Sequence, residues 1–367
     1  MMAEKIFTIP TDVFGRLESG EDIREGSYLN YVTYGDLNDT KTNCVLWMTC
    51  YSQRTPDMVT FIGPGKRFDC DRLFLVTVNM IGNGLSMSPV KDKNAWPKGG
   101  FTYGDTARAV NLLLQSLGVT CVALCYGFSM GAMFAFEYCV RFPDAIKTAV
   151  ATCGSAKCNP ANQWFLTHLA DALRNDANAE VDPETKRIVG FNGVPQPKAL
   201  DTFAGIYADW ILDAPRPESD GALCPNSARP EFARSIHGDG RAYLENLHGF
   251  ASTDAWMTFF RARYDTWDVL EYYEVSDMWR RGDVSKNDVY RGDLKKALSA
   301  IRAAMWILPG NTDQYFRAEE IAEEAKMVPN ATFEPLVSSM GHMAEFDDAC
   351  QPAINKAIAA ALAYAGL

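Results

Sequence analysis

The sequence contains no run of eighteen or more apolar residues, so no segment is long and apolar enough to span a membrane. Its first ten residues, MMAEKIFTIP, lack the apolar core of a secretory signal peptide. Its last five, AYAGL, do not match a peroxisomal signal of the SKL type. We therefore expect a cytoplasmic protein without a membrane span.

Basic residues are in the minority, because 35 Lys and Arg face 46 Asp and Glu and leave a formal net charge of -11. Nucleic-acid binding needs a basic face that neutralises phosphates, so we exclude it as the main activity. The same sign disfavours binding to an anionic membrane surface. A small, neutral substrate remains compatible with this charge, and the 367 residues fit one large core with an inserted subdomain.

Metal-binding patterns are also lacking. The ten cysteines include no CxxC pair, which excludes zinc ribbons and thioredoxin-like motifs. Several lie in apolar runs, such as Cys121 and Cys125 in VTCVALCYG, and are expected to be buried free thiols. The sequence has only four histidines, and their spacing matches no zinc motif. We predict neither a metal site nor a cofactor.

Strand-like and helical patterns alternate in the first part of the chain. The expected strands are 28–34, 44–48, 73–78, 122–126 and 147–152, and the expected helices are 105–117 and 130–142. This order predicts an α/β fold with a mostly parallel, doubly wound sheet.

The pattern changes after the fifth strand. Residues 155–295 show amphipathic, aromatic-rich segments and Pro- and Gly-rich loops but no buried strand, which indicates an inserted helical cap. The core then resumes with a strand at 304–308, a helix at 317–327, a strand at 332–336 and a last helix at 347–364. The expected organisation is core 1–154, cap 155–295 and core 296–367.

A G-x-S-x-G motif, Gly127-Phe128-Ser129-Met130-Gly131, follows one expected strand and precedes one expected helix. The motif alone is weak, since about one chain in ten of this length would contain it by chance. Its strand-turn-helix setting is what indicates a nucleophile elbow, with Ser129 as the nucleophile. The alternative is a tight turn in which Ser129 only caps the helix.

A serine nucleophile needs a base within hydrogen-bond reach. His342, in SSMGHMAEF, lies on an expected loop between the last strand and the last helix, where the order Ser, acid, His puts the base. The alternative for His342 is a purely local hydrogen bond. His168 fits a surface or packing role on a cap helix, and His237 or His248 could line a pocket.

The acid that orients the histidine should follow the penultimate strand, and Asp313 in LPGNTDQYF does so. Its alternative role is an Asx turn or a helix cap ahead of Arg317. Glu345 and Asp347 are rival acids, but both come after His342 and break the expected order.

Two backbone N–H groups should form the oxyanion hole. One is that of Met130, directly after the nucleophile. The other comes from the loop 49–52, where we select Tyr51. Cys50 in the same loop could be a catalytic thiol, although a buried or pocket-lining thiol is the more ordinary reading.

These segments resemble the homoserine O-acetyltransferase-like branch of the α/β-hydrolases. The similar stretches are YVTYGDLN at 31–38, IGPGKRFDCDRLFLVTVN at 62–79, the elbow YGFSMGAMFAFEYCVRFPD, and the GNTD and GH segments around Asp313 and His342. The resemblance spans roughly 28–160 and 303–346, whereas the cap matches poorly. It implies the α/β-hydrolase fold with a helical cap, the triad Ser129, Asp313 and His342, and a homodimer formed through the cap helices.

The resemblance does not extend to the residues that bind homoserine. In the transacetylases an aspartate that helps to hold the amine directly follows the histidine, but here Met343 stands there. The transacetylases also have an arginine that binds the homoserine carboxylate. The corresponding position here is near Ala170, and Arg174 lies one turn further on. Without both charged partners, nothing evident holds a zwitterionic amino acid, which favours a more apolar or neutral substrate.

We predict an ester hydrolase that acts on a small acyl substrate through an acyl-enzyme on Ser129. The first alternative is an O-acyltransferase, dependent on acetyl-CoA or intramolecular, that is not specific for homoserine. The second is a ligand-binding protein of low turnover on the same fold. Hydrolase and transferase differ in whether the cap excludes water, which the sequence does not reveal.

Overall fold

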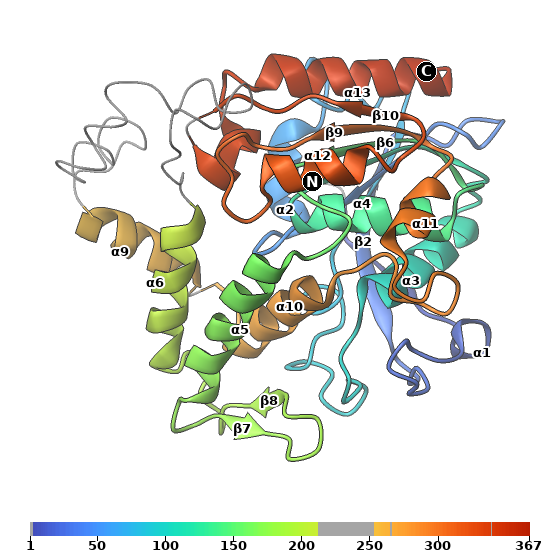
Figure 1. The fold of residues 1–367 in the computed structure, drawn as a ribbon. Helices are drawn as coiled ribbons and strands as arrows, with labels where there is room; N and C mark the ends of the chain where they lie inside the picture. The colour runs from blue at the N-terminus through green and yellow to red at the C-terminus, as the bar shows by residue number, and fades with distance from the viewer. Residues whose placement is uncertain (1–2, 212–252, 265, 339) are drawn as a thin grey trace.

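An eight-stranded sheet forms the centre of the molecule (Figure 1). The computed structural model describes residues 3–211, 253–264, 266–338 and 340–367. Within these ranges, the strands follow the spatial order β1 (Lys5–Thr8), β2 (Tyr28–Tyr34), β4 (Phe74–Val78), β3 (Cys44–Met48), β5 (Val122–Phe128), β6 (Ile146–Thr152), β9 (Ala304–Leu308) and β10 (Ala331–Phe333).

The sheet is parallel from β4 to β10 and antiparallel at the β1–β2–β4 edge. The inner strands β3, β4 and β5 are buried along their whole length, as expected of short apolar runs covered on both faces. The predicted doubly wound, mostly parallel α/β sheet is confirmed. The edge strand β1 was not predicted, because its residues are largely exposed and show no buried pattern.

Helices cover both faces of the sheet. The last helix, α13 (Gln351–Ala365), lies along one face, and α3 (Tyr103–Ser116) and α4 (Met130–Arg141) lie along the other (Figure 1). Helix α3 begins two residues before the predicted start, because Asp105 is the third residue of a capping box with Thr102 rather than the first of the helix. None of the described helices has both the length and the apolarity that crossing a bilayer requires.

Smaller elements complete the core. They are α1 (Thr11–Phe14), α2 (Thr55–Met58), η1 (Val59–Phe61), α11 (Leu294–Ser299), α12 (Ala318–Ala325) and η3 (Gly341–Phe346). Helix α12 is shorter at both ends than the helix predicted at 317–327, and the last helix begins at Gln351 rather than near 347. His342 lies in the 3-10 helix η3, not on the loop that the sequence predicts.

The expected cap stretch contributes four described helices beside the sheet (Figure 1). These cap helices are α5 (Pro160–Arg174), α6 (Ala199–Ile211), α9 (Thr253–Tyr264) and α10 (Val269–Arg281). A small hairpin, β7 (Glu180–Val181) with β8 (Ile188–Gly190), was not predicted, because strands of two and three residues leave no periodic pattern. His237 and His248 lie outside the described residues.

Helix α10 is buried and carries three carboxylates whose side chains are at most 5% exposed. Each faces at least one arginine, and these arginines come from the core, from the β7–β8 hairpin and from α10 itself. The pairs are Glu271 with Arg54, Glu274 with Arg187, and Asp277 with Arg187, Arg280 and Arg281. Because a buried carboxylate is costly without a cation, these pairs fix α10 between the core and the hairpin.

A buried carboxylate also joins the core to the start of the cap. Glu324 on α12 accepts a hydrogen bond from the Ala156 backbone N–H at 2.8 Å. Burial raises the pKa of Glu324 from its ordinary value of 4.5 to about 8, against the opposing effect of the backbone N–H donors. Between these two pH values the unfolded chain is ionised at this residue and the folded protein is not, so stability falls as pH rises.

We expect Glu324→Gln to be about as stable as the wild type near pH 4 and more stable by roughly 2–4 kcal/mol at pH 8. The amide keeps an oxygen acceptor for Ala156 but has no charge to desolvate. Urea unfolding at a series of pH values measures the difference. Glu323→Gln, on the exposed side of the same helix, is the control, and an equal pH dependence in both variants would contradict the prediction.

Candidate active site

Ser129 stands at the sharp turn between β5 and α4, with backbone angles of φ 57° and ψ −122°. A positive φ is strained for any residue but glycine, and strain of this kind persists only where the surrounding structure enforces it. The side chain makes no capping hydrogen bond and is buried. The turn therefore has the form of a nucleophile elbow rather than that of a capped helix.

The two glycines of the motif are required by close packing. A Cβ atom on Gly127 would overlap the backbone carbonyl of Gly131, and one on Gly131 would lie 2.9 Å from the carbonyl oxygen of Met48. The elbow thus allows β5, α4 and the end of β3 to approach one another without side chains between them.

We expect Gly127→Ala to destabilise the protein by about 3 kcal/mol or more, because its methyl group meets backbone that cannot rotate away. The midpoint of thermal or urea unfolding reports the change. Gly205→Ala on α6 is the matched control, since its Cβ would approach only the Met257 Cε, at 3.6 Å. Similar stability of the two variants would contradict the packing argument.

Ser129, His342 and Asp313 form one hydrogen-bonded chain. The Nε2 of His342 lies 2.8 Å from the Oγ of Ser129, and its Nδ1 lies 2.7 Å from the Oδ2 of Asp313. The three side chains are at most 3% exposed. Segments that are 213 and 29 residues apart in the sequence thus meet at the carboxyl end of the parallel strands.

Asp313 also makes the turn that the sequence suggests as its alternative role. Its Oδ1 accepts the backbone N–H groups of Tyr315 at 2.8 Å and Phe316 at 3.1 Å, which leaves Oδ2 for His342. The rival acids are engaged elsewhere. Glu345 pairs with Arg67, and Asp347 accepts the hydroxyl of Ser338 at 2.5 Å.

Aromatic rings enclose the imidazole of His342. Phe128 stacks on it at 4.9 Å between ring centroids, and Tyr315 and Phe316 approach at 4.9 and 5.5 Å. Rings fixed on three sides leave the imidazole little freedom to rotate. Sequence reasoning did not find these three residues, whose only signal was their position beside the motif and beside Asp313.

Helix α5 of the cap supports the segment that carries Asp313. The Nδ2 of Asn162 donates to the backbone oxygen of Tyr315, and Asn159 donates to the same oxygen at 3.4 Å. Asn159 also caps α5 by accepting the Asn162 backbone N–H at 2.8 Å. The helix N-cap signal Asn159-Pro160 is visible in the sequence, but the contact of Asn159 and Asn162 with Tyr315 is not.

The two backbone N–H groups predicted for the oxyanion hole are that of Met130, directly after Ser129, and that of Tyr51, in the loop after β3. Among the hydrogen bonds of the described residues, neither the Met130 N–H nor the Tyr51 N–H has an acceptor. The neighbouring Cys50 N–H is occupied, because it donates to Gln53 Oε1 at 3.1 Å. Burial raises the pKa of the Cys50 thiol to about 12, so this cysteine is not a thiolate at neutral pH.

The positions that correspond to homoserine-binding residues carry no usable charge. Met343 is partly buried and Ala170 is buried. Arg174, at the end of α5, is paired with Asp171. His168 is exposed on α5. Within the described ranges, no three His, Cys, Asp or Glu side chains gather as a metal site would require.

Aromatic side chains fill the space between the triad and the cap helices. Tyr51 stacks on Tyr207 of α6 at 5.0 Å, and Tyr207 packs on Tyr315 at 5.4 Å. The hydroxyl of Tyr315 donates to the Tyr207 backbone oxygen at 2.8 Å. Helix α6 therefore presents the ring of Tyr207 toward the segment that holds Asp313.

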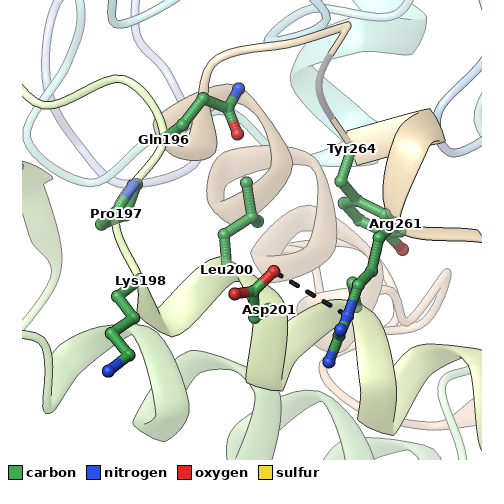
Figure 2. Close-up of a pocket in the computed structure, with 8 residues that line it drawn as sticks. Gln196, Pro197, Lys198, Leu200, Asp201, Arg261 and Tyr264 are labelled. Atoms are coloured by element: carbon green, nitrogen blue, oxygen red, sulfur yellow. Dashed lines mark ion pairs between the residues drawn. The ribbon is translucent and has the colours of Figure 1, made fainter. Parts of the chain in front are cut away.

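A small pocket of about 120 Å³ lies between α6 and α9 (Figure 2). Gln196, Pro197 and Leu200 line one side of it, and an exposed ion pair at 3.8 Å joins Asp201 to Arg261 across it. No triad residue lines this pocket. Its buried wall, Tyr264, packs on Tyr207 at 6.1 Å and so belongs to the same aromatic layer.

Known proteins are similar to this chain in both sequence and fold. Residues 58–182 match the model of the alpha/beta hydrolase fold family. An ethyl acetate hydrolase from Pseudomonas veronii is 31% identical over 336 residues, 90% of this chain and 87% of the relative. A homoserine O-acetyltransferase from Chloroherpeton thalassium is 26% identical, over 85% of this chain and 78% of the relative.

Among solved structures, that of the acetyl esterase MekB superposes with a TM-score of 0.78 at 27% identity and covers 98% of this chain and 97% of its own. The chain therefore belongs to the α/β-hydrolase family, in the branch that includes esterases and homoserine O-acetyltransferases.

Proposed function

We propose that this chain is a serine ester hydrolase that cleaves esters of short acyl groups, acetyl esters above all. The observation that carries the proposal is the continuous hydrogen-bond chain from Ser129 through His342 to Asp313. The acetyl group is inferred from two similar proteins, because one is named an ethyl acetate hydrolase and the other an acetyl esterase.

In the proposed reaction the Oγ of Ser129 attacks the ester carbonyl while the Nε2 of His342 takes its proton. Asp313 holds the imidazole in the required tautomer and stabilises the imidazolium. The N–H groups of Met130 and Tyr51 stabilise the oxyanion. His342 then protonates the departing alcohol, and water that it activates releases the acid from Ser129.

Among the described residues, the side chains at the positions that correspond to homoserine-binding residues support a neutral ester as substrate. A zwitterionic acceptor such as homoserine needs a carboxylate and a cation as partners, and Met343, Ala170 and the paired Arg174 supply neither. The rings of Tyr51, Tyr207 and Tyr315 instead offer an apolar wall of the kind that holds small esters.

Acyl transfer to an alcohol is the second candidate, and the relative that is a homoserine O-acetyltransferase favours it. Both reactions share one acyl-enzyme and differ in whether water or an alcohol accepts the acyl group. The homodimer through the cap helices and the cytoplasmic location stay predictions, which gel filtration and fractionation of cells test.

The test is a comparison of acceptors. The purified protein is incubated with ethyl acetate, with ethyl butyrate, and with acetyl-CoA in the presence and absence of homoserine and simple alcohols. We expect acetate release from ethyl acetate at a rate independent of added alcohol. CoA release that depends on an alcohol would instead establish the transferase, and the absence of turnover together with failure of a fluorophosphonate to label Ser129 would establish a binding protein.

A further inference from the structure

Arg67 lies buried beneath the helix that carries His342, although the proposed reaction does not use it. It lies in the loop between η1 and β4, and its side chain is 3% exposed. The guanidinium pairs with the Glu345 carboxylate and donates to Tyr126 Oη at 2.6 Å and to Gln351 Oε1 at 2.7 Å. One buried cation therefore serves acceptors from three segments.

Two of these acceptors, Tyr126 and Glu345, belong to the segments that carry the reacting groups. Tyr126 lies on β5, three residues before Ser129, and Glu345 lies on η3, three residues after His342. A 3-10 helix has three residues per turn, so His342 and Glu345 lie above one another on the same face of η3. Arg67 thus joins the strand of the nucleophile to the helix of the base.

Two aromatic rings and further hydrogen bonds also hold the cluster. The guanidinium carbon lies 4.8 Å from the ring centre of Phe61 and 5.3 Å from that of Tyr126. The Tyr126 hydroxyl donates to the same Glu345 oxygen as Arg67, and Gln351 Nε2 donates to the Glu345 backbone oxygen at 2.7 Å. A planar guanidinium with five N–H groups matches this set of acceptors, whereas the ammonium of lysine does not.

Helix η3 needs support of this kind. It has six residues, and the hydrogen bonds of a 3-10 helix are poorly aligned. It begins at Gly341, whose φ is 58°, and its Glu345 is a buried carboxylate that requires a cation.

We propose that Arg67 is a positioning residue: by holding Glu345, it fixes η3 so that the Nε2 of His342 stays within hydrogen-bond reach of Ser129. The inference rests on the proposed hydrolase function, because it needs His342 to act as the base. Misplacement of a catalytic group by 1 Å costs about 100-fold in rate, so loss of Arg67 lowers kcat far more than it changes KM.

The experiment compares Arg67→Ala with Arg187→Ala. Arg187 is also a buried arginine that pairs with two carboxylates and lies over a tyrosine ring, at 5.7 Å from Tyr273, but its partners are on α10. Unfolding midpoints of both variants are measured, and kcat and KM for p-nitrophenyl acetate are determined well below them. We expect about a 100-fold loss of kcat with unchanged KM in Arg67→Ala and near wild-type values in Arg187→Ala.

Rescue separates positioning from a general loss of stability. Arg67→Ala leaves a guanidinium-sized space between Phe61 and Tyr126, and we expect guanidinium at non-denaturing concentration to restore most of the lost kcat. Methylammonium, which lacks the planar fork, should not. Guanidinium should not raise the activity of Arg187→Ala. If Arg67→Ala does not fold, Arg67→Lys is tested in its place. We then expect a smaller loss of kcat, which added guanidinium does not restore.

Equal kcat values in the Arg67→Ala and Arg187→Ala variants would overturn the inference, and so would an Arg67→Ala defect confined to KM. Failure of guanidinium to rescue a folded Arg67→Ala variant would also overturn it. If Arg67→Lys has to replace Arg67→Ala, a wild-type kcat in that variant would overturn it. The failure of the proposed function looks different, because in that case the wild-type protein itself does not hydrolyse the ester.

Discussion

Replacing Ser129 with alanine is expected to lower kcat/KM for acetyl esters by about 10⁴- to 10⁶-fold while the fold is retained. The substitution removes the only oxygen that faces the Nε2 of His342 at 2.8 Å in the described structure, so no acyl-enzyme forms. Steady-state hydrolysis of p-nitrophenyl acetate measures the loss. Mass spectrometry after fluorophosphonate treatment should find one modified serine in the wild type and none in the variant.

Ser155→Ala is the matched control for this result. Ser155 is also a buried serine near the carboxyl ends of the strands, but its hydroxyl donates to the Lys157 backbone oxygen at 2.8 Å. We expect it to cost a little stability and little activity. Labelling that persists in Ser129→Ala would mean that another residue is the nucleophile and would overturn the proposed mechanism.

Asp313→Asn is expected to lower kcat by about 10⁴-fold with little change in stability. The amide keeps the size of the carboxylate and one oxygen for the N–H groups of Tyr315 and Phe316. Its NH₂ group then faces the Nδ1 of His342, which holds the imidazole in the wrong tautomer and provides no charge for the imidazolium. Initial rates of ester hydrolysis across pH 6–9 check this effect.

Asp347→Asn makes the same chemical change close by, because Asp347 lies five residues after His342 and binds Ser338. We expect it to keep most of the wild-type activity. A large loss in Asp347→Asn together with a small one in Asp313→Asn would identify Asp347 as the acid, in the order that the sequence argument rejects.

The core of the fold was accessible from sequence because its signals are local. Apolar runs such as CVLWM and FLVTV are long enough to identify buried strands, and Gly127 of the elbow is required by a contact with Gly131, four residues away. The roles of Ser129, Asp313 and His342 were then assigned from the chain order Ser, acid, His that is expected of this fold. The structure places these three side chains within hydrogen-bond distance of one another, and their catalytic roles stay a prediction.

Other features had no local signal. The exposed strand β1 and the short β7–β8 hairpin show no period that a pattern could reveal. The pair of Arg67 with Glu345 joins positions 278 residues apart, and neither residue belongs to the nucleophile motif. The helical form of η3 also depends on packing, because a six-residue helix that begins at a glycine has little intrinsic preference for a helical conformation.

The paired carboxylates of α10 bear on how this enzyme could acquire new substrates. Exchanging the whole cap for that of a relative would leave Arg54 in the core, whose side chain is 27% exposed, without its anionic partner Glu271 and would therefore lower stability. Among the described residues, an exposed ion pair joins α6 to α9 across a small pocket. Directed evolution of altered ester preference should therefore accumulate substitutions in α6 and α9 and leave α10 unchanged.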